Sequence, residues 1–81
     1  MSKVVVVFKV YPKDDAFDKA VEEIKGMGPN DIKSEDIGFG IKVIKVSFIY
    51  EDSAGGSSDI EDRLKKLESI SEVEVAEETL L

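Results

Sequence analysis

The chain has 81 residues with a net charge of −7, and it contains neither cysteine nor histidine. A chain this short forms a single domain, residues 1–81, and must bury nearly every long apolar run. The missing cysteines exclude disulfides and thiol chemistry, and the missing histidines remove the usual general base and the commonest metal ligand. No apolar run is long enough to span a membrane and no signal peptide is recognisable, so we expect a cytoplasmic protein.

The first third of the chain predicts a strand and a helix. Residues 3–11 (KVVVVFKVY) are β-branched or aromatic almost throughout, which is typical of a central strand, and Pro12 ends it. Asp14 and Asp15 then offer a cap for a helix that ends in the glycine-rich segment 26–29. Its apolar residues recur at helical spacing at Phe17, Ala20, Val21 and Ile24.

The middle of the chain predicts two strands and a turn. Residues 30–37 are polar, which fits an edge strand whose charges discourage aggregation. Residues 41–50 predict a strong strand, in which the odd positions are mixed in character. Residues 52–57 (DSAGGS) are typical of a turn, since two glycines can adopt positive φ. The even positions of that strand make one apolar face, namely Ile44, Val46, Phe48 and Tyr50.

The last third of the chain predicts a second helix and a final strand. Ser58 and Glu61 match the Ser-x-x-Glu capping box. The buried stripe of this helix is expected at Ile60, Leu64 and Leu67. Residues 71–77 (SEVEVAE) alternate polar and apolar, which predicts a strand with Val73 and Val75 pointing inward.

The order of elements is therefore β-α-β-β-α-β, the ferredoxin-like arrangement of the α+β class. We expect a four-stranded antiparallel sheet in the order fourth, first, third and second strand. Two helices would cover one face, and the other face would stay open to solvent or to a partner.

The segment IGFGIKVIKV, residues 37–46, invites comparison with RNA-recognition modules, which share this topology. Their third strand carries a cation, then Gly-Phe-Gly, then further aromatics. Here Ile37 replaces the cation, while Ile41 and Ile44 replace the aromatics. A local basic patch could form from Lys3, Lys9, Lys42 and Lys45, but in an acidic chain these lysines are better interpreted as residues of solvated strand ends and faces. We therefore do not expect direct binding of nucleic acid.

Phe39 has two interpretations from spacing alone. It lies just before the strong strand, between Gly38 and Gly40, at a position whose parity matches the mixed odd face. It could project from the end of the sheet as an anchor for a partner's pocket. Equally, it could fold over the end of the sheet and complete the core.

A family resemblance favours the first interpretation. The run IGFGIK, residues 37–42, follows the acidic pair Glu35–Asp36 and resembles the signature of translation elongation factor one-beta. The likeness extends over the whole chain, through residues 3–12, the Ala-Gly-Gly turn at 54–56 and the Val-Glu-Val strand at 73–75. The length is similar to the compact archaeal form, which corresponds to the C-terminal exchange domain of the eukaryotic factor.

The resemblance implies a guanine-nucleotide exchange factor for elongation factor one-alpha, the GTPase that brings aminoacyl-tRNA to the ribosome. It implies that Phe39 is the anchor, that its two glycine neighbours allow close backbone approach, and that Lys42 forms an ion pair with the GTPase. It also implies that the C-terminal end reaches toward the magnesium and phosphate site. The partner-binding residues so implied are Ile37, Gly38, Phe39, Gly40, Lys42, Thr79, Leu80 and Leu81.

One departure from the family pattern concerns the C-terminus. Eukaryotic relatives end in a lysine and a leucine, and that lysine is implicated in disturbing the magnesium site. This chain ends in EETLL and has no cation after Lys66. The lysine mechanism therefore does not transfer, and the hypothesis that remains is displacement of GTPase elements, with a tail carboxylate competing for magnesium. A tail that is frayed or simply packed is the alternative.

A rival function from another class is a small-molecule-sensing regulatory domain, because related βαββαβ modules bind amino acids at paired interfaces. Such domains pair with a copy or with an attached enzyme, and this chain has no attached enzyme. Enzymatic catalysis is not expected, since no nucleophile motif is present. We expect no cofactor and a monomer in isolation.

Overall fold

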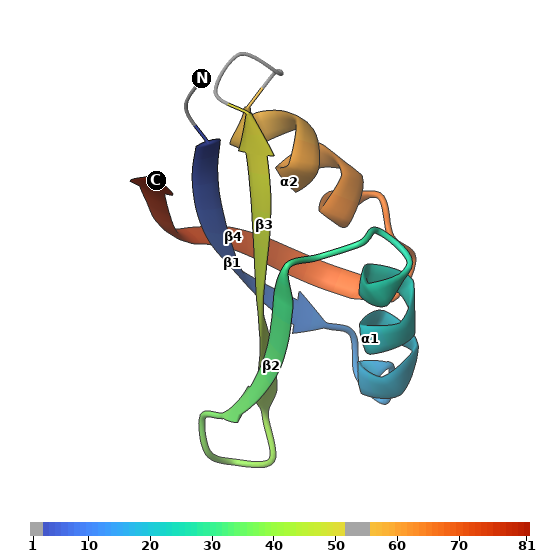
Figure 1. The fold of residues 1–81 in the computed structure, drawn as a ribbon. Helices are drawn as coiled ribbons and strands as arrows, with labels where there is room; N and C mark the ends of the chain where they lie inside the picture. Colours follow the sequence, from blue (N-terminus) through green and yellow to red (C-terminus); the bar gives the residue numbers. More distant parts are fainter. Residues whose placement is uncertain (1–2, 52–55) are drawn as a thin grey trace.

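The computed structural model describes residues 3–51 and 56–81 and has the predicted order of elements (Figure 1). The elements are β1 (Lys3–Pro12), α1 (Phe17–Lys25), β2 (Asp31–Asp36), β3 (Lys42–Glu51), α2 (Ser57–Lys65) and β4 (Ile70–Leu80). The strands form one antiparallel sheet in the order β2-β3-β1-β4, which confirms the predicted ferredoxin-like fold and strand order. Most of the turn predicted at 52–57 lies outside the described residues.

The core lies between the sheet and the two helices, which cover the same face (Figure 1). Alternate residues of β1 are buried because successive side chains of a strand point to opposite faces. Phe8 of β1 meets Phe48 of β3 edge to face, with 6.1 Å between the ring centroids. The apolar face predicted for β3 packs into or against this core, as expected.

Both helices bury the apolar stripes that the sequence predicts. Ala20 and Ile24 of α1 and Leu64 of α2 are fully buried, and the remaining stripe residues are partly buried against them. Within the described ranges, no helix is long and apolar enough to cross a membrane.

The predicted N-terminal caps are wrong at both helices, whereas α1 ends before Gly26 as predicted. The chain turns at Asp15 through a left-handed conformation, with φ of 59°, so that Ala16 occupies the N-cap position of α1 and no side chain caps it. Helix α2 begins two residues earlier than the capping box predicts, at Ser57, with Gly56 rather than Ser58 at its N-cap. Ser58 therefore lies inside the first turn, where it cannot cap the helix with Glu61.

Strand β4 differs from its prediction in length and in the burial of one position. Val75 lies opposite the buried Phe8, on the same face as the buried Val73, so it points to the predicted face, yet it is 44% exposed. The reason is that β4 is an edge strand of the sheet. The strand also continues to Leu80, beyond the predicted end at residue 77.

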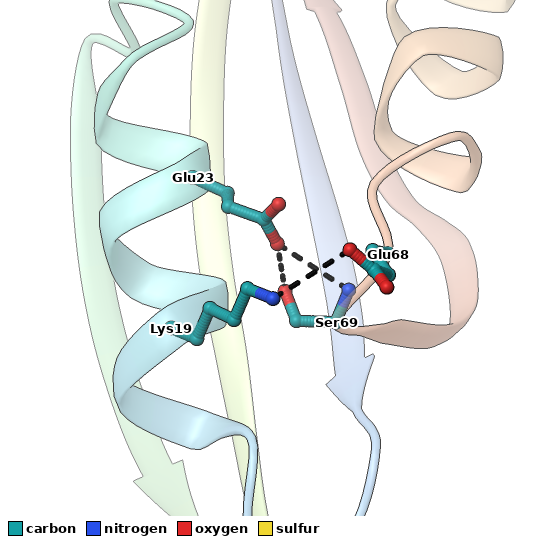
Figure 2. Close-up of polar contacts among 4 residues, drawn as sticks. All are labelled: Lys19, Glu23, Glu68 and Ser69. Carbon is teal, nitrogen blue, oxygen red and sulfur yellow. Dashed lines mark hydrogen bonds and ion pairs between the residues drawn. The ribbon is translucent and has the colours of Figure 1, made fainter.

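A polar cluster fastens α1 to the segment between α2 and β4 (Figure 2). Ser69 is only 3% exposed, and both its hydroxyl and its main-chain N–H donate to the Glu23 carboxylate, the latter over 3.3 Å. Lys19 forms an exposed ion pair with Glu68 beside it, at 3.6 Å. Because the buried serine has its hydrogen bonds satisfied, this contact holds α1 in place without a polar burial penalty.

Candidate partner-binding site

Residues 37–41 connect β2 to β3 and form the tip of a hairpin at one end of the sheet (Figure 1). At this tip the side chain of Phe39 is fully exposed, with a relative accessibility of 101%. Of the two interpretations left open by the sequence, the structure therefore selects projection from the end of the sheet. The alternative, in which the ring completes the core, is excluded.

The backbone at the tip is left-handed at three consecutive residues. The φ angles are 97° at Gly38, 58° at Phe39 and 74° at Gly40. Glycine adopts this region freely, whereas a bulky residue such as phenylalanine does so rarely and at some cost in energy. A Cβ at either glycine would meet nothing within 4 Å, so backbone conformation rather than space requires glycine here.

Local hydrogen bonds hold the loop in this conformation. The Asp36 carboxylate accepts from the main-chain N–H of Gly38 at 2.9 Å. Ile37 N–H donates to the carbonyl of Ile41 at 3.0 Å, and Ile41 N–H donates to the carbonyl of Gly38 at 3.0 Å. The loop that presents Phe39 is thus already ordered, which reduces the entropy lost when a partner binds the ring.

The aromatic ring has apolar neighbours. Ile37 and Ile41, at the two ends of the loop, are both about half exposed. Together with Phe39 they place three large apolar side chains on the surface of a strongly acidic chain. Exposed apolar clusters of this kind mark protein interaction sites, and rigid aromatic side chains often dominate binding energy at such sites.

Lys42 lies at the base of the hairpin. Its Nζ is 5.2 Å from the centroid of the Phe17 ring, in a cation–π contact that leaves the side chain exposed. A hollow of about 310 Å³ lies beside it. The hollow is lined by the β1–α1 connection and the base of the loop, namely Pro12, Lys13, Asp14, Asp15, Phe17, Gly40, Ile41 and Lys42.

The C-terminal residues lie at the opposite end of the sheet (Figure 1). Thr79 and Leu80 pair with Val5 and Val4, and Leu81 N–H donates to the Lys3 carbonyl at 2.7 Å. The tail is therefore packed rather than frayed, although both leucine side chains are exposed. Because the molecule is 42 Å long, the structure does not bring these residues together with the hairpin.

The C-terminal end also contains a perturbed carboxylate. Hydrogen bonds from the hydroxyls of Ser57 and Tyr50 lower the pKa of Glu78 below its usual range, since they favour the ionised form. Within residues 3–51 and 56–81, no three acidic side chains gather closely enough to hold a metal ion.

Sequence reasoning located Phe39 but missed the groups that order its loop. Asp36 was interpreted only as part of an acidic pair, whereas its carboxylate supports the turn. The available signal was an aspartate two residues before a glycine, a spacing at which aspartate side chains accept from the backbone. Ile41, which the sequence pattern places at the start of the strand 41–50, lies instead in the hairpin loop before β3 and is half exposed.

Comparisons with known proteins agree with this arrangement. Residues 5–81 match the family described as the EF-1 guanine nucleotide exchange domain. The chain is 40% identical to elongation factor 1-beta of Aeropyrum pernix, over 93% of this chain and 92% of the relative. It is 34% identical to that of Methanosphaerula palustris, over 99% of both chains, and 33% identical to that of Thermoplasma acidophilum, over the full length of both.

Proposed function

The chain belongs to the EF-1 guanine nucleotide exchange family and acts on elongation factor 1-alpha, and on this premise we propose that Phe39 is the residue that anchors it to the GTPase. The observation that carries this proposal is a fully exposed ring on a loop whose backbone is already hydrogen-bonded. The ring would enter a groove on the GTPase, with Ile37 and Ile41 excluding water around it. The exchange would take place in the cytoplasm during translation elongation.

Exchange of this kind needs no covalent chemistry. The protein must bind the empty GTPase more tightly than the nucleotide-loaded one. By linkage, it then weakens nucleotide binding by the same factor by which nucleotide weakens its own binding. A coupling of about 4 kcal/mol corresponds to roughly a thousandfold loss of nucleotide affinity. GTP then refills the vacated site because the cell contains more GTP than GDP.

The remaining implied residues would act at two separate contacts. Gly38, Gly40 and Lys42 belong to the hairpin contact, in which the lysine would leave the Phe17 ring to pair with a carboxylate of the GTPase. Thr79, Leu80 and Leu81 would form a second contact from the other end of the sheet. No cation follows Lys66, so this second contact would work through apolar packing and carboxylates rather than through a terminal lysine.

The test is release of fluorescent GDP from elongation factor 1-alpha. We expect Phe39→Ala to reduce the stimulated release by the equivalent of about 2–4 kcal/mol, the range for truncation of an aromatic anchor. The thermal unfolding midpoint should stay unchanged, because the ring makes no contact in the core. The matched control is Ile49→Ala, which removes another exposed apolar side chain, 45% accessible, from the open face of the sheet.

A folded Phe39→Ala protein with unchanged release kinetics would remove Phe39 from the mechanism. An equal loss from Ile49→Ala would show that exposed apolar area in general, rather than the hairpin ring, supports binding.

A further inference from the structure

The last residues of β4 form a separate stretch of the sheet ladder. The register with β1 shifts at Ala76, which has no partner residue in β1 and forms a β-bulge. Residues 77–80 lie beyond this bulge, on an edge strand that pairs only with β1 among the residues that the structure describes. The end of an edge strand tends to fray unless another contact fixes it.

The Glu78 side chain ties this stretch to two other elements. The Tyr50 hydroxyl, from β3, donates to Glu78 Oε1 over 2.8 Å, and the Ser57 hydroxyl, from α2, donates to the same carboxylate. The bonds from Ser57 and Tyr50 lower the pKa of Glu78, so the carboxylate is ionised at neutral pH. Because β1 lies between β3 and β4, Tyr50 reaches across a whole strand to make its bond.

The same carboxylate lies beside the start of α2. Gly56 occupies the N-cap position, so this helix has no side-chain cap of its own. Ser57 is the first residue of the helix, and its hydroxyl holds Glu78 near the helix N-terminus, where a negative charge is favourable. Glu78 thus joins the end of the last strand to the second helix as well as to β3.

This contact lies next to the two exposed leucines of the C-terminal end. Leu80 follows Glu78 by two residues and points to the same face of the sheet. Leu81 N–H donates to the Lys3 carbonyl at 2.7 Å, and the two leucines are 62% and 66% exposed. An end of β4 that is fixed before binding loses less entropy when a partner contacts these side chains.

We propose that Glu78 is a positioning residue for nucleotide exchange, which holds the end of β4 so that Leu80 and Leu81 meet the GTPase in a fixed arrangement. Tyr50 and Ser57 support Glu78 in this role, and Glu78 acts through the residues that follow it rather than by touching the GTPase. The inference rests on the second contact proposed above for residues 79–81.

The first measurement is hydrogen exchange at the Leu81 amide, followed by NMR in the free, full-length protein. We expect Glu78→Ala to speed this exchange about threefold, the lower end of the range for a net hydrogen bond, because the site is exposed. Amides of the ladder between β1 and β3 should change less. Glu78→Gln keeps an oxygen that accepts from a hydroxyl and should stay close to the parent protein. An unchanged Leu81 amide in Glu78→Ala overturns the proposal.

The second measurement is stimulated GDP release per folded molecule, which a merely structural role would leave unchanged. Glu78→Ala should reduce it about threefold. The control is Ile24→Val, which lowers stability by removing a buried methylene far from the end of β4 and should leave release normal. Tyr50→Phe, which removes only the hydroxyl, should cause part of the loss and no further loss in a Glu78→Ala background. Additive losses would contradict a shared role.

Deletion of residues 79–81 separates this proposal from the contact on which it rests. If the deletion reduces release per folded molecule and Glu78→Ala does not, the second contact stands and the positioning role is overturned. If Glu78→Ala reduces release and the deletion does not, Glu78 does not act through the end of β4, and the proposal is again overturned. If neither changes release, both fall. The hairpin contact is tested separately by Phe39→Ala.

Discussion

The two ends of the sheet both expose apolar side chains, but they hold them in different ways. At the hairpin end, Phe39 stands on a short loop whose hydrogen bonds are all made within residues 36–41. At the C-terminal end, Leu80 and Leu81 belong to a long strand whose main chain bonds to β1, a segment distant in sequence.

The difference teaches which residues can be changed without disturbing the fold. On the proposed function, a side chain on the hairpin should contribute to binding and little to stability, so binding and folding should be separable there. Residues at the C-terminal end should contribute to both, because removing them also removes part of the sheet ladder.

The largest effect on stability is expected in the core, between the two ends of the sheet. Phe8 is fully buried and packs on Phe48 at the centre of the sheet. Phe8→Ala should lower the free energy of unfolding by about 3–5 kcal/mol, measured by chemical denaturation. Stimulated GDP release per folded molecule should stay normal, since neither end is altered. A loss of exchange greater than the loss of folded protein would contradict the separation of core and contact surface.

Deletion of Thr79–Leu81 should affect stability and exchange together. It removes the last pairs between β4 and β1, including the bond from Leu81 N–H to the Lys3 carbonyl. We expect the free energy of unfolding to fall by about 1–3 kcal/mol, the sum of a few net hydrogen bonds. The side-chain variant Leu80→Ser keeps the main chain in place and serves as the control. A deletion that leaves the unfolding midpoint unchanged would show that this end is no more integrated than the hairpin.

Gly40→Ala should affect exchange more than stability. With φ at 74°, alanine is strained by about 1 kcal/mol, and the loop relieves that strain by changing conformation. Stimulated GDP release should fall by roughly fivefold while the unfolding midpoint moves little. D-Alanine at this position, introduced by chemical synthesis, favours positive φ and should restore release. Equal release from both variants would mean that loop conformation does not matter to binding.

The smallest effects are expected at one carboxylate near each end of the sheet, Glu35 and Glu78. The ion pair with Lys45 lowers the pKa of Glu35, and hydrogen bonds from Ser57 and Tyr50 lower the pKa of Glu78. Because each pKa is lower in the folded state, each contribution is present above the unfolded pKa and is lost as pH falls through the folded one. Glu35→Gln and Glu78→Gln should each flatten the acid side of a stability–pH profile.

Salt distinguishes these two carboxylates. An exposed ion pair is screened by salt, whereas hydrogen bonds from neutral hydroxyls are not. Added salt should therefore reduce the difference between Glu35→Gln and the parent protein, and should leave the difference for Glu78→Gln nearly unchanged. Identical salt dependence in unfolding experiments would contradict the assigned causes of the two pKa shifts.

The strands and their order could be predicted because their signals are long and redundant. The β-branched run of β1 and the apolar parity of β3 each fix a face of the sheet. The N-terminal caps of the two helices could not be predicted, because each depends on one or two backbone angles. The left-handed turn at Asp15 and the early start of α2 at Ser57 displaced both predicted capping groups.

The hairpin was only half predictable. The IGFGIK motif located Phe39, but spacing alone could not decide whether its ring projects or packs inward. That outcome depends on consecutive left-handed residues, and the sequence offered glycines for only two of them. The exposure of Val75 was not predictable either, because an alternating pattern gives the face to which a side chain points but not how well that face is covered at an edge strand.

The hydrogen bond from Leu81 N–H to the Lys3 carbonyl brings the start of β1 beside the end of β4, far from the hairpin. A linker could therefore join these positions and the chain could be reopened elsewhere as a circular permutant. Tags, fluorophores or additional domains attached at these positions would leave the Phe39 loop unobstructed but would lie beside the second contact proposed at residues 79–81. Immobilising the protein there would therefore direct the hairpin outward and leave the hairpin contact to be measured alone.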